Sequence, residues 1–457
     1  MLIRFVRFLA GLVLVPWLQA QLLDGVWRSQ GYGIVIEIQG PTLKEFQVTA
    51  TTCLPGFTAR RDPTPIAGRE ATFMAPDGQV LFIRAGGGAD HKLLHNEGSA
   101  SDVRIDRLVR LPSVCDHATP NTPVGNFEVF SSTWAEHYIL FDQKKIDWGE
   151  VVRVNQRKIK SETTPAELFD IFAGMIEPFH DSHTFISAPD IKRQFSNFRP
   201  GTHRVIKGSM REFRREGMPA LLAITDRAFL KTPLRKWCND QFQYGHVDDS
   251  TGYLRILSFS GFAKGGFTAG LAALEAALDE IFSDPQLKAL VIDVRINFGG
   301  EDPYGLAIAS RLATREYLAY TKEARSDPVD RNKWTPGDAS MVRPGLRPGF
   351  RGPVVELIGP LTISAGETFT QALMGRTPHV TRIGENTQGV FSDVLGRKLP
   401  NGWEFGLPNE VFRTPQGSTF DGSGIPPDIV VPVFADGDVA ARSDPPMMKA
   451  LQILGNK

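Results

Sequence analysis

Ser364, His183 and Asp421 are residue types that together could carry out acyl transfer. A serine hydroxyl is a poor nucleophile until a base removes its proton, and an imidazole can take and return that proton near neutral pH. An acid can orient the base, and the chain order of such sets differs between folds. Each residue also has an ordinary interpretation: Ser364 as a helix cap, His183 as a solvated loop residue, and Asp421 as a turn residue before glycine.

The neighbourhood of Ser364 favours an anion-binding site. A buried strand is expected from Val354 to Ile358, and a helical run is expected from Thr368 to Met374. Ser364 would then lie at a strand-to-helix junction, with the Ala365 N–H at the helix start. Unpaired donors and the positive end of the helix dipole favour negative charge there, so this N–H could stabilise a tetrahedral oxyanion.

A second donor could come from Gly299 or Gly300, which follow an apolar strand expected from Ala289 to Val294. Glycines let the backbone turn sharply and let a ligand approach its amides closely. A glycine pair after a strand is also common in simple turns, so both interpretations stay open.

His183 lies on a loop that a helix delivers. Thr164 and Glu167 have the spacing of a capping box, and Pro165 suits the first helical position, so a helix is expected to begin there. The helix should end at Pro178, which places His183 on the loop that follows.

Four ordered motifs together resemble the C-terminal processing, or tail-specific, protease family of serine peptidases. The resemblance covers roughly residues 126–431 and rests on Asp-x-Arg-x-Asn-x-Gly-Gly at 293–300, Ser-Ala-Gly-Glu at 364–367, Gly-Glu-Asn-Thr-Gln-Gly at 384–389 and Gly-Ile-Pro-Pro-Asp at 424–428. It implies that Ser364 is the nucleophile and His183 the base. It further implies orienting roles for Ser182 and Asp421, oxyanion donors from Gly299 or Gly300 with Ala365, and no metal or organic cofactor.

The sequence departs from the family pattern at the base and in the accessory module. Bacterial processing members carry a catalytic Lys at the position of Val390, whereas the tricorn core branch uses a Ser-His pair that Ser182 and His183 resemble. That branch more often has Glu where Asp421 stands. Lys398 is an alternative base, but it lies on an expected hairpin strand where a solvated Lys is ordinary. No carboxylate-binding loop of a PDZ domain is recognised between residues 186 and 243.

The elements that must position these residues indicate an α/β fold class in a multidomain chain, with a sandwich-like α/β catalytic core. The expected segments are a signal peptide at 1–20, a small β-rich accessory domain at 21–118, a helical segment carrying the His motif at 124–190, a connecting region at 191–245, a catalytic domain at 246–440 and a tail at 441–457. A chain of 457 residues is long enough for two or three domains.

The N-terminus indicates export. Arg4 and Arg7 precede a short apolar run that ends at Ala20, which is typical of a secretory signal; a membrane anchor is the alternative. The protein would then be periplasmic or extracellular. In an oxidising compartment Cys53 and Cys115 could form a disulfide, a pairing that sequence alone does not establish.

The family resemblance implies a peptide or protein substrate as the partner, and the charge balance does not favour another class. The 51 Lys and Arg residues equal the 51 Asp and Glu residues, which gives no global reason to favour nucleic acid or an anionic membrane. Two other functions remain. A catalytically inactive module on the same fold could bind a retinoid or lipid, and an α/β-hydrolase esterase is disfavoured because no Gly-x-Ser-x-Gly surrounds Ser364.

Overall fold

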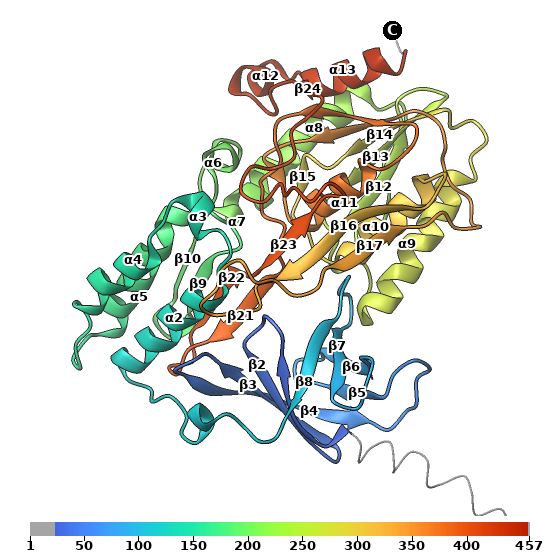
Figure 1. Ribbon diagram of the computed structural model, residues 1–457. Coiled ribbons are helices and arrows are strands. Elements are labelled where there is room, and N and C mark those ends of the chain that lie inside the picture. The colour runs from blue at the N-terminus through green and yellow to red at the C-terminus, as the bar shows by residue number, and fades with distance from the viewer. Residues whose placement is uncertain (1–22, 456–457) are drawn as a thin grey trace, which may run out of the picture.

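A computed structural model describes residues 23–455 (Figure 1). An N-terminal β-barrel lies at one end, a helical lobe lies beside it, and a larger α/β unit makes up the remainder. The expected signal peptide at 1–20 falls outside the described residues. None of the helices within 23–455 combines the length and the hydropathy that a membrane span requires.

The β-rich domain is a closed antiparallel barrel in which each strand pairs with the next and β8 closes on β1. Its interior is filled by apolar side chains such as Trp27, Phe73 and Ile83, which are buried because alternate residues of each strand point inward. The strands are β1 (Gly25–Ser29), β2 (Ile34–Gln39), β3 (Thr42–Val48), β4 (Cys53–Asp62), β5 (Ala71–Met74), β6 (Val80–Ala85), β7 (His91–Asn96) and β8 (Val103–Leu108).

A disulfide joins Cys53 at the start of β4 to Cys115 in the 3-10 turn η1 (Ser113–Cys115), as the sequence allowed. The linkage fixes the chain leaving the barrel against the barrel wall across 62 residues of sequence. Cys238 is buried and unpaired.

Removing this disulfide should destabilise the barrel. We expect Cys53→Ala with Cys115→Ala to lower its free energy of unfolding by about 2–5 kcal/mol, because the cross-link restricts the unfolded chain. Thermal unfolding with and without a reductant measures this. Reductant should lower the midpoint of the wild type but not that of the double variant, and equal midpoints for all four samples would contradict the expectation.

The helical lobe has an aromatic core to which Phe130, Trp134, Trp148 and Phe172 contribute stacked and tilted contacts. Its helices are α2 (Pro123–His137), α3 (Phe141–Lys144), α4 (Trp148–Gln156) and α5 (Pro165–Ile176), followed by the turn η2 (Glu177–Phe179). The helix start expected at Pro165 is found there, with the Thr164 capping box formed.

A four-stranded sheet joins the helical lobe to the late part of the chain. Its order is β10–β9–β22–β21, so strands that are more than 200 residues apart in sequence pair side by side. The bounds are β9 (Phe185–Ala188), β10 (Arg193–Ser196), β21 (Val394–Lys398) and β22 (Glu404–Pro408), with the turn η3 (Pro189–Ile191) between the first two.

The α/β unit is built on a seven-stranded sheet of order β11–β12–β13–β14–β18–β20–β24, parallel from β13 onward. Its strands are β11 (Arg235–Trp237), β12 (Phe242–His246), β13 (Thr251–Ile256), β14 (Ala289–Asp293), β18 (Val354–Ile358), β20 (Val380–Gly384) and β24 (Ile429–Val430). The helices are α9 (Gly266–Phe282), α10 (Asp302–Leu312) and α11 (Ala365–Leu373). This arrangement confirms the α/β fold class.

Two smaller sheets complete the unit. One pairs β15 (Ile296–Asn297) with β19 (Leu361–Thr362), and the other has the order β17 (Asp338–Val342), β16 (Tyr317–Ala324), β23 (Glu410–Arg413). The first pair brings the chain after β14 beside the chain before Ser364.

The regions expected to connect or follow the catalytic domain are integrated into it. The boundary expected at residue 246 falls inside the β11–β12 pair of the large sheet, and α13 (Pro445–Ile453) packs on β18 and β20. The connecting region thus supplies two strands of the large sheet, and the expected tail supplies a helix that covers one of its faces. The remaining elements are α6 (Pro200–Ile206), α7 (Met210–Glu212), the π-helical turn η4 (Phe213–Gly217), α8 (Met218–Phe229) and α12 (Asp436–Ala441).

Candidate active site

Ser364 occupies a strained turn between β19 and α11. Its φ of 55° and ψ of −120° are unusual for a residue with a side chain. Gly299 packs directly against it, because a Cβ built on Gly299 would lie 2.6 Å from the Ser364 Cβ. Only glycine fits that position, and the close contact helps to hold the serine in its turn. Nucleophilic serines of α/β hydrolases are presented on turns of this kind.

Gly300 and Ala365 are the chain neighbours of the two residues in contact, Gly299 and Ser364, and their amides are candidate oxyanion donors. The Gly299 N–H donates to the Asn297 Oδ1 at 2.9 Å, so it is already engaged. Within residues 23–455 no hydrogen bond is formed by the N–H groups of Gly300 and Ala365. Of the two glycines that the sequence left open, Gly300 is therefore the one with a free donor.

The buried carboxylate of Glu367 connects the Ser364 turn to the loop after β20. It accepts N–H donors from Ser364 at 3.2 Å, Gly389 at 2.6 Å and Val390 at 2.8 Å. Burial raises its pKa to about 7, against the lowering effect of these hydrogen bonds and of the Thr387 side chain. Sequence reasoning missed this role, although Ser364 and Glu367 have the spacing of a capping box.

Ser182 is fixed to the same loop from the other side. Its hydroxyl donates to Oε1 of Gln388, whose Nε2 donates to the Thr202 hydroxyl at 2.8 Å. The Gln388 N–H donates to the Thr362 carbonyl at 3.1 Å, two residues before Ser364. The loop that carries the histidine is therefore attached to the strand that carries the serine.

His183 is half-buried, and its imidazole forms a hydrogen bond with the backbone of Ser392. Its Nδ1 is buried and has no hydrogen-bond partner in the described part of the chain. Desolvation lowers the pKa of His183, although the charges of Asp181 and Asp393 oppose this shift. A lowered pKa keeps the imidazole neutral at neutral pH, which is the form that can accept a proton.

Segment 388–392 consequently contacts both halves of the expected pair. Glu367 attaches the Ser364 turn to Gly389 and Val390, while His183 lies against Ser392.

Asp421 is buried but is hydrogen-bonded to groups other than the imidazole. Its Oδ1 accepts the Phe391 N–H at 3.2 Å and its Oδ2 accepts the Thr419 hydroxyl at 2.9 Å. Burial raises its pKa to about 7. The bond to Phe391 holds the backbone next to Ser392. Asp421 is therefore connected to His183 only indirectly, through this loop. Its direct orienting role remains a prediction.

Asp181 is a nearby acid that the sequence reasoning did not single out. Its Oδ1 accepts the backbone N–H of His183 at 2.8 Å, and its Oδ2 is buried without a partner among the residues described. Burial raises its pKa, and the charge of His183 is the strongest opposing influence. The available signal was an Asp two residues before a loop His, a spacing typical of an Asx turn.

The sequence offers two positions for a lysine base, and neither places an amine at the site in the described part of the chain. Val390 is buried in an apolar cluster with Ile363 and Ile296, so no amine occupies the position where bacterial relatives carry Lys. Lys398 lies on the expected hairpin strand, exposed and 3.5 Å from the Glu404 carboxylate. Within residues 23–455 no three His, Cys, Asp or Glu side chains are grouped so as to bind a metal ion.

The strained turn of Ser364, packed against Gly299 and carried on a covered parallel sheet, resembles the turn that presents the nucleophile in serine hydrolases of the α/β class. Residues 250–431 match the model of peptidase family S41. This match supports the enzyme class expected from the sequence, a hydrolase of the peptidase type.

Similar proteins agree with this assignment. A carboxy-terminal-processing protease of Bartonella bacilliformis is 27% identical over 185 residues, which cover 40% of this chain and 39% of that protein's length. A candidate peptidase of Parabacteroides merdae has a similar structure, with a TM-score of 0.60 and 25% identity over 73% of this chain and 97% of its own. Mature CPAF complexed with lactacystin shares the fold, with a TM-score of 0.52 and 12% identity over 73% and 97% of the two chains.

Proposed function

We propose that the protein is an exported serine peptidase that hydrolyses peptide bonds through an acyl-enzyme. Ser364 is the nucleophile and His183 the general base. The proposal rests on one observation, which is that both residues are connected to segment 388–392. Glu367 joins the Ser364 turn to Gly389 and Val390, and the His183 imidazole contacts the backbone of Ser392. The assignment of residues 250–431 to a peptidase family supports the reaction class.

The reaction follows from these groups without further reagents. The Ser364 hydroxyl attacks the scissile carbonyl carbon while His183 takes its proton. The amides of Gly300 and Ala365 donate to the oxyanion of the tetrahedral intermediate, which collapses as His183 protonates the leaving amine. Water then attacks the acyl-enzyme, His183 takes a proton from that water, and Ser364 regains its hydroxyl hydrogen as the acid product leaves.

The disulfide supports export as part of the proposal. Disulfides such as Cys53–Cys115 persist in oxidising compartments, and residues 1–20 carry the pattern of a secretory signal. Detection of the processed protein outside the cytoplasm of its host would test this part. Recovery of the unprocessed chain from the cytoplasm alone would contradict it.

A fluorophosphonate probe tests the nucleophile directly. The purified protein should be labelled, and peptide mapping by mass spectrometry should place the adduct on Ser364. Labelling should fall by about 100-fold or more in His183→Gln, since the neutral serine lacks its base. A probe that attaches elsewhere, or not at all, would reject the assignment.

The pH dependence of hydrolysis tests His183 as the base. Because burial lowers the pKa of His183, kcat/KM should be constant from about pH 7 to 8 and should fall as the pH decreases through a value below about 6.5. Protonation removes the base, so the sign is a loss in acid. His180→Asn, at an exposed position on the same loop, is the matched control and should keep the profile. A rate that rises toward acid would contradict a histidine base.

A further inference from the structure

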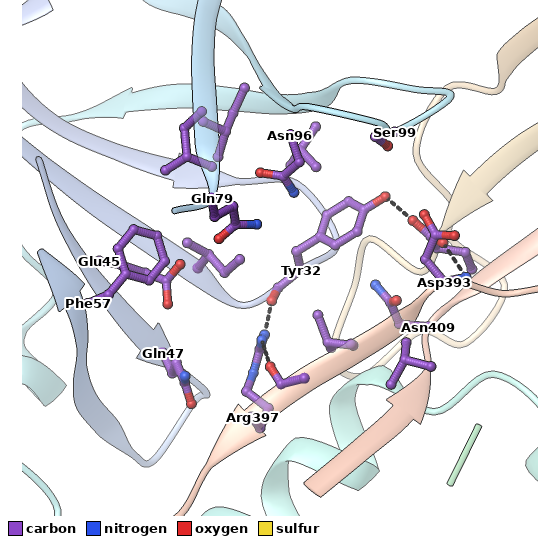
Figure 2. Close-up of a pocket in the computed structure, with 18 of the residues that line it drawn as sticks. Tyr32, Glu45, Gln47, Phe57, Gln79, Asn96, Ser99, Asp393, Arg397 and Asn409 are labelled. Atoms are coloured by element: carbon purple, nitrogen blue, oxygen red, sulfur yellow. Dashed lines mark hydrogen bonds between the residues drawn. The ribbon is translucent and has the colours of Figure 1, made fainter. Parts of the chain in front are cut away.

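A cavity of about 430 Å³ lies between the mouth of the barrel and the β21–β22 hairpin (Figure 2). On the barrel side it is lined by half-buried apolar side chains at the edge of the barrel core, among them Ile34, Phe57 and Val103, and by polar side chains that include Glu45 and Gln79. On the opposite side it is lined by Phe185 and by β21. The barrel lies outside the part of the chain that matches family S41, so the family match assigns no role to this cavity.

One wall of the cavity lies near the candidate base. Phe185 lies two residues after His183, and Asp393, whose charge acts on the imidazole, directly follows Ser392, whose backbone contacts it.

The outer edge of β21 faces the barrel with backbone groups that can pair with another strand. β21 is the last strand of its sheet, and the Lys398 N–H donates to Gln47 Oε1 of the barrel at 3.0 Å, away from β22. Alternate residues of a strand direct their N–H and C=O groups to the same side, so Val394 and Gly396 face this way too. The Gly396 carbonyl accepts Nη1 of Arg397 at 3.0 Å, so the groups of this edge that could pair with an added strand are those of Val394 and the Gly396 N–H. An edge of this kind is a template for an added strand.

Gly396 lines the cavity on the β21 side. A Cβ built on this residue would meet no atom within 4 Å, whereas one on Gly406, its cross-strand partner, would lie 2.3 Å from Phe185. A side chain introduced at position 396 would therefore enter open space above the sheet.

The barrel is held in place across the cavity by specific contacts. Tyr32, in the turn between β1 and β2, donates to the Glu410 carboxylate at 2.5 Å, and Arg397 donates to the Tyr32 carbonyl (Figure 2). Lys322 also pairs with Glu410 at 3.2 Å. A cavity whose two walls are fixed to each other costs less ordering when it binds a ligand.

We propose that this cavity binds an extended segment of the peptide substrate, which adds to β21 as a further strand and places alternate apolar side chains in the barrel mouth. The inference rests on the proposed peptidase function. A peptide is favoured over a lipid as the occupant because the edge of β21 offers N–H and C=O groups, which a peptide backbone matches and a hydrocarbon chain does not. Alternate side chains of a strand point to one face, which explains the apolar requirement at every second residue.

Binding to the Ser364→Ala protein, which should hold peptides without cleaving them, tests the proposal. The probe is a fluorescein-labelled peptide of about ten residues with Leu and Val at alternate positions, and the measurement is fluorescence anisotropy. Adding Gly396→Trp fills the open space and should weaken binding by about ten-fold or more. Gly174→Trp, at an exposed helical position where a Cβ also meets no atom, is the matched control and should leave the affinity unchanged.

A second variant and a second readout keep the outcomes distinct. Phe57→Asp places a charge in the barrel mouth and should also weaken binding of the apolar probe, while a probe with Asp at the alternate positions should bind weakly to every variant. Equal affinities for the wild-type cavity and both cavity variants would overturn the proposal. A fluorescent fatty acid that binds, and is lost in Gly396→Trp while the peptide never binds, would overturn it in favour of a lipid.

Fluorophosphonate labelling separates this inference from the proposed function. The probe is small, so Gly396→Trp with Ser364 intact should be labelled at a rate within about two-fold of the wild type. If the wild type is not labelled, the proposed function fails, and the anisotropy result still decides whether the cavity binds peptides. If labelling succeeds and the affinity is insensitive to Gly396→Trp, the function stands and the cavity proposal fails.

Discussion

Ser364→Ala should lower peptide hydrolysis by at least about a thousand-fold, the loss expected when an acyl-transfer site is left with only its oxyanion donors and substrate binding. The loss should appear in kcat, because the hydroxyl acts in the chemical step. The measurement is the steady-state rate with an unstructured protein substrate, together with titration of active sites by the fluorophosphonate probe.

The variant should fold as the wild type does. Within residues 23–455 no hydrogen bond is donated by the Ser364 hydroxyl, and Glu367 receives the backbone N–H of residue 364, which alanine retains. Ser423→Ala, at an exposed position in the Asp421 loop, is the matched control and should keep full activity. Turnover by Ser364→Ala at more than a few per cent of the wild-type rate would mean that another residue is the nucleophile.

Local patterns in the sequence predicted local structure well. The strand expected from Val354 to Ile358 has those bounds, and the helix expected at Pro165 begins there with its capping box. Both signals depend on residues within one turn or one strand. Helix α10 begins at Asp302, with Glu301 as its N-cap. The Asp302 carboxylate accepts the Thr368 hydroxyl at 2.6 Å, a tertiary contact that a local pattern does not reveal.

The parts of the site that the sequence did not predict depend on residues distant along the chain. The Glu367 carboxylate is saturated by amides more than 20 residues away, and the choice of Gly300 over Gly299 follows from the side chain of Asn297. The closure of the eight strands into a barrel likewise requires β1 to meet β8, which no adjacent pair of strands specifies. The ordered motifs identify the candidate residues in the sequence. The hydrogen bonds between distant loops that hold these residues in place are visible only in the structure.

Arg295→Met should be among the most destabilising single substitutions in the α/β unit, at a cost of about 3–5 kcal/mol. The Arg295 guanidinium is buried between the carboxylates of Asp293 at 2.7 Å and Asp444 at 2.6 Å, which joins the motif strand to the start of α13. Methionine fills much of the volume but leaves two buried carboxylates without their cation. The midpoint of chemical denaturation measures the loss.

The pH dependence of the stability loss, and a comparison with an exposed arginine, distinguish the loss of the Arg295 ion pairs from a loss of packing. Burial alone would raise the pKa of Asp293, but Arg295 holds it below the ordinary value, so the pair contributes stability above the unfolded pKa of about 4 and loses it as the pH falls through the folded pKa. The difference between Arg295→Met and the wild type should therefore be larger at pH 7.5 than at pH 4.5, where Asp293 in the variant can take up a proton. Arg347→Met removes an exposed partner of Glu275 and Asp279 and should cost no more than about 1 kcal/mol. Equal losses of unfolding free energy for the two variants would contradict the prediction, because the buried ion pairs of Arg295 would then stabilise the fold no more than exposed ones.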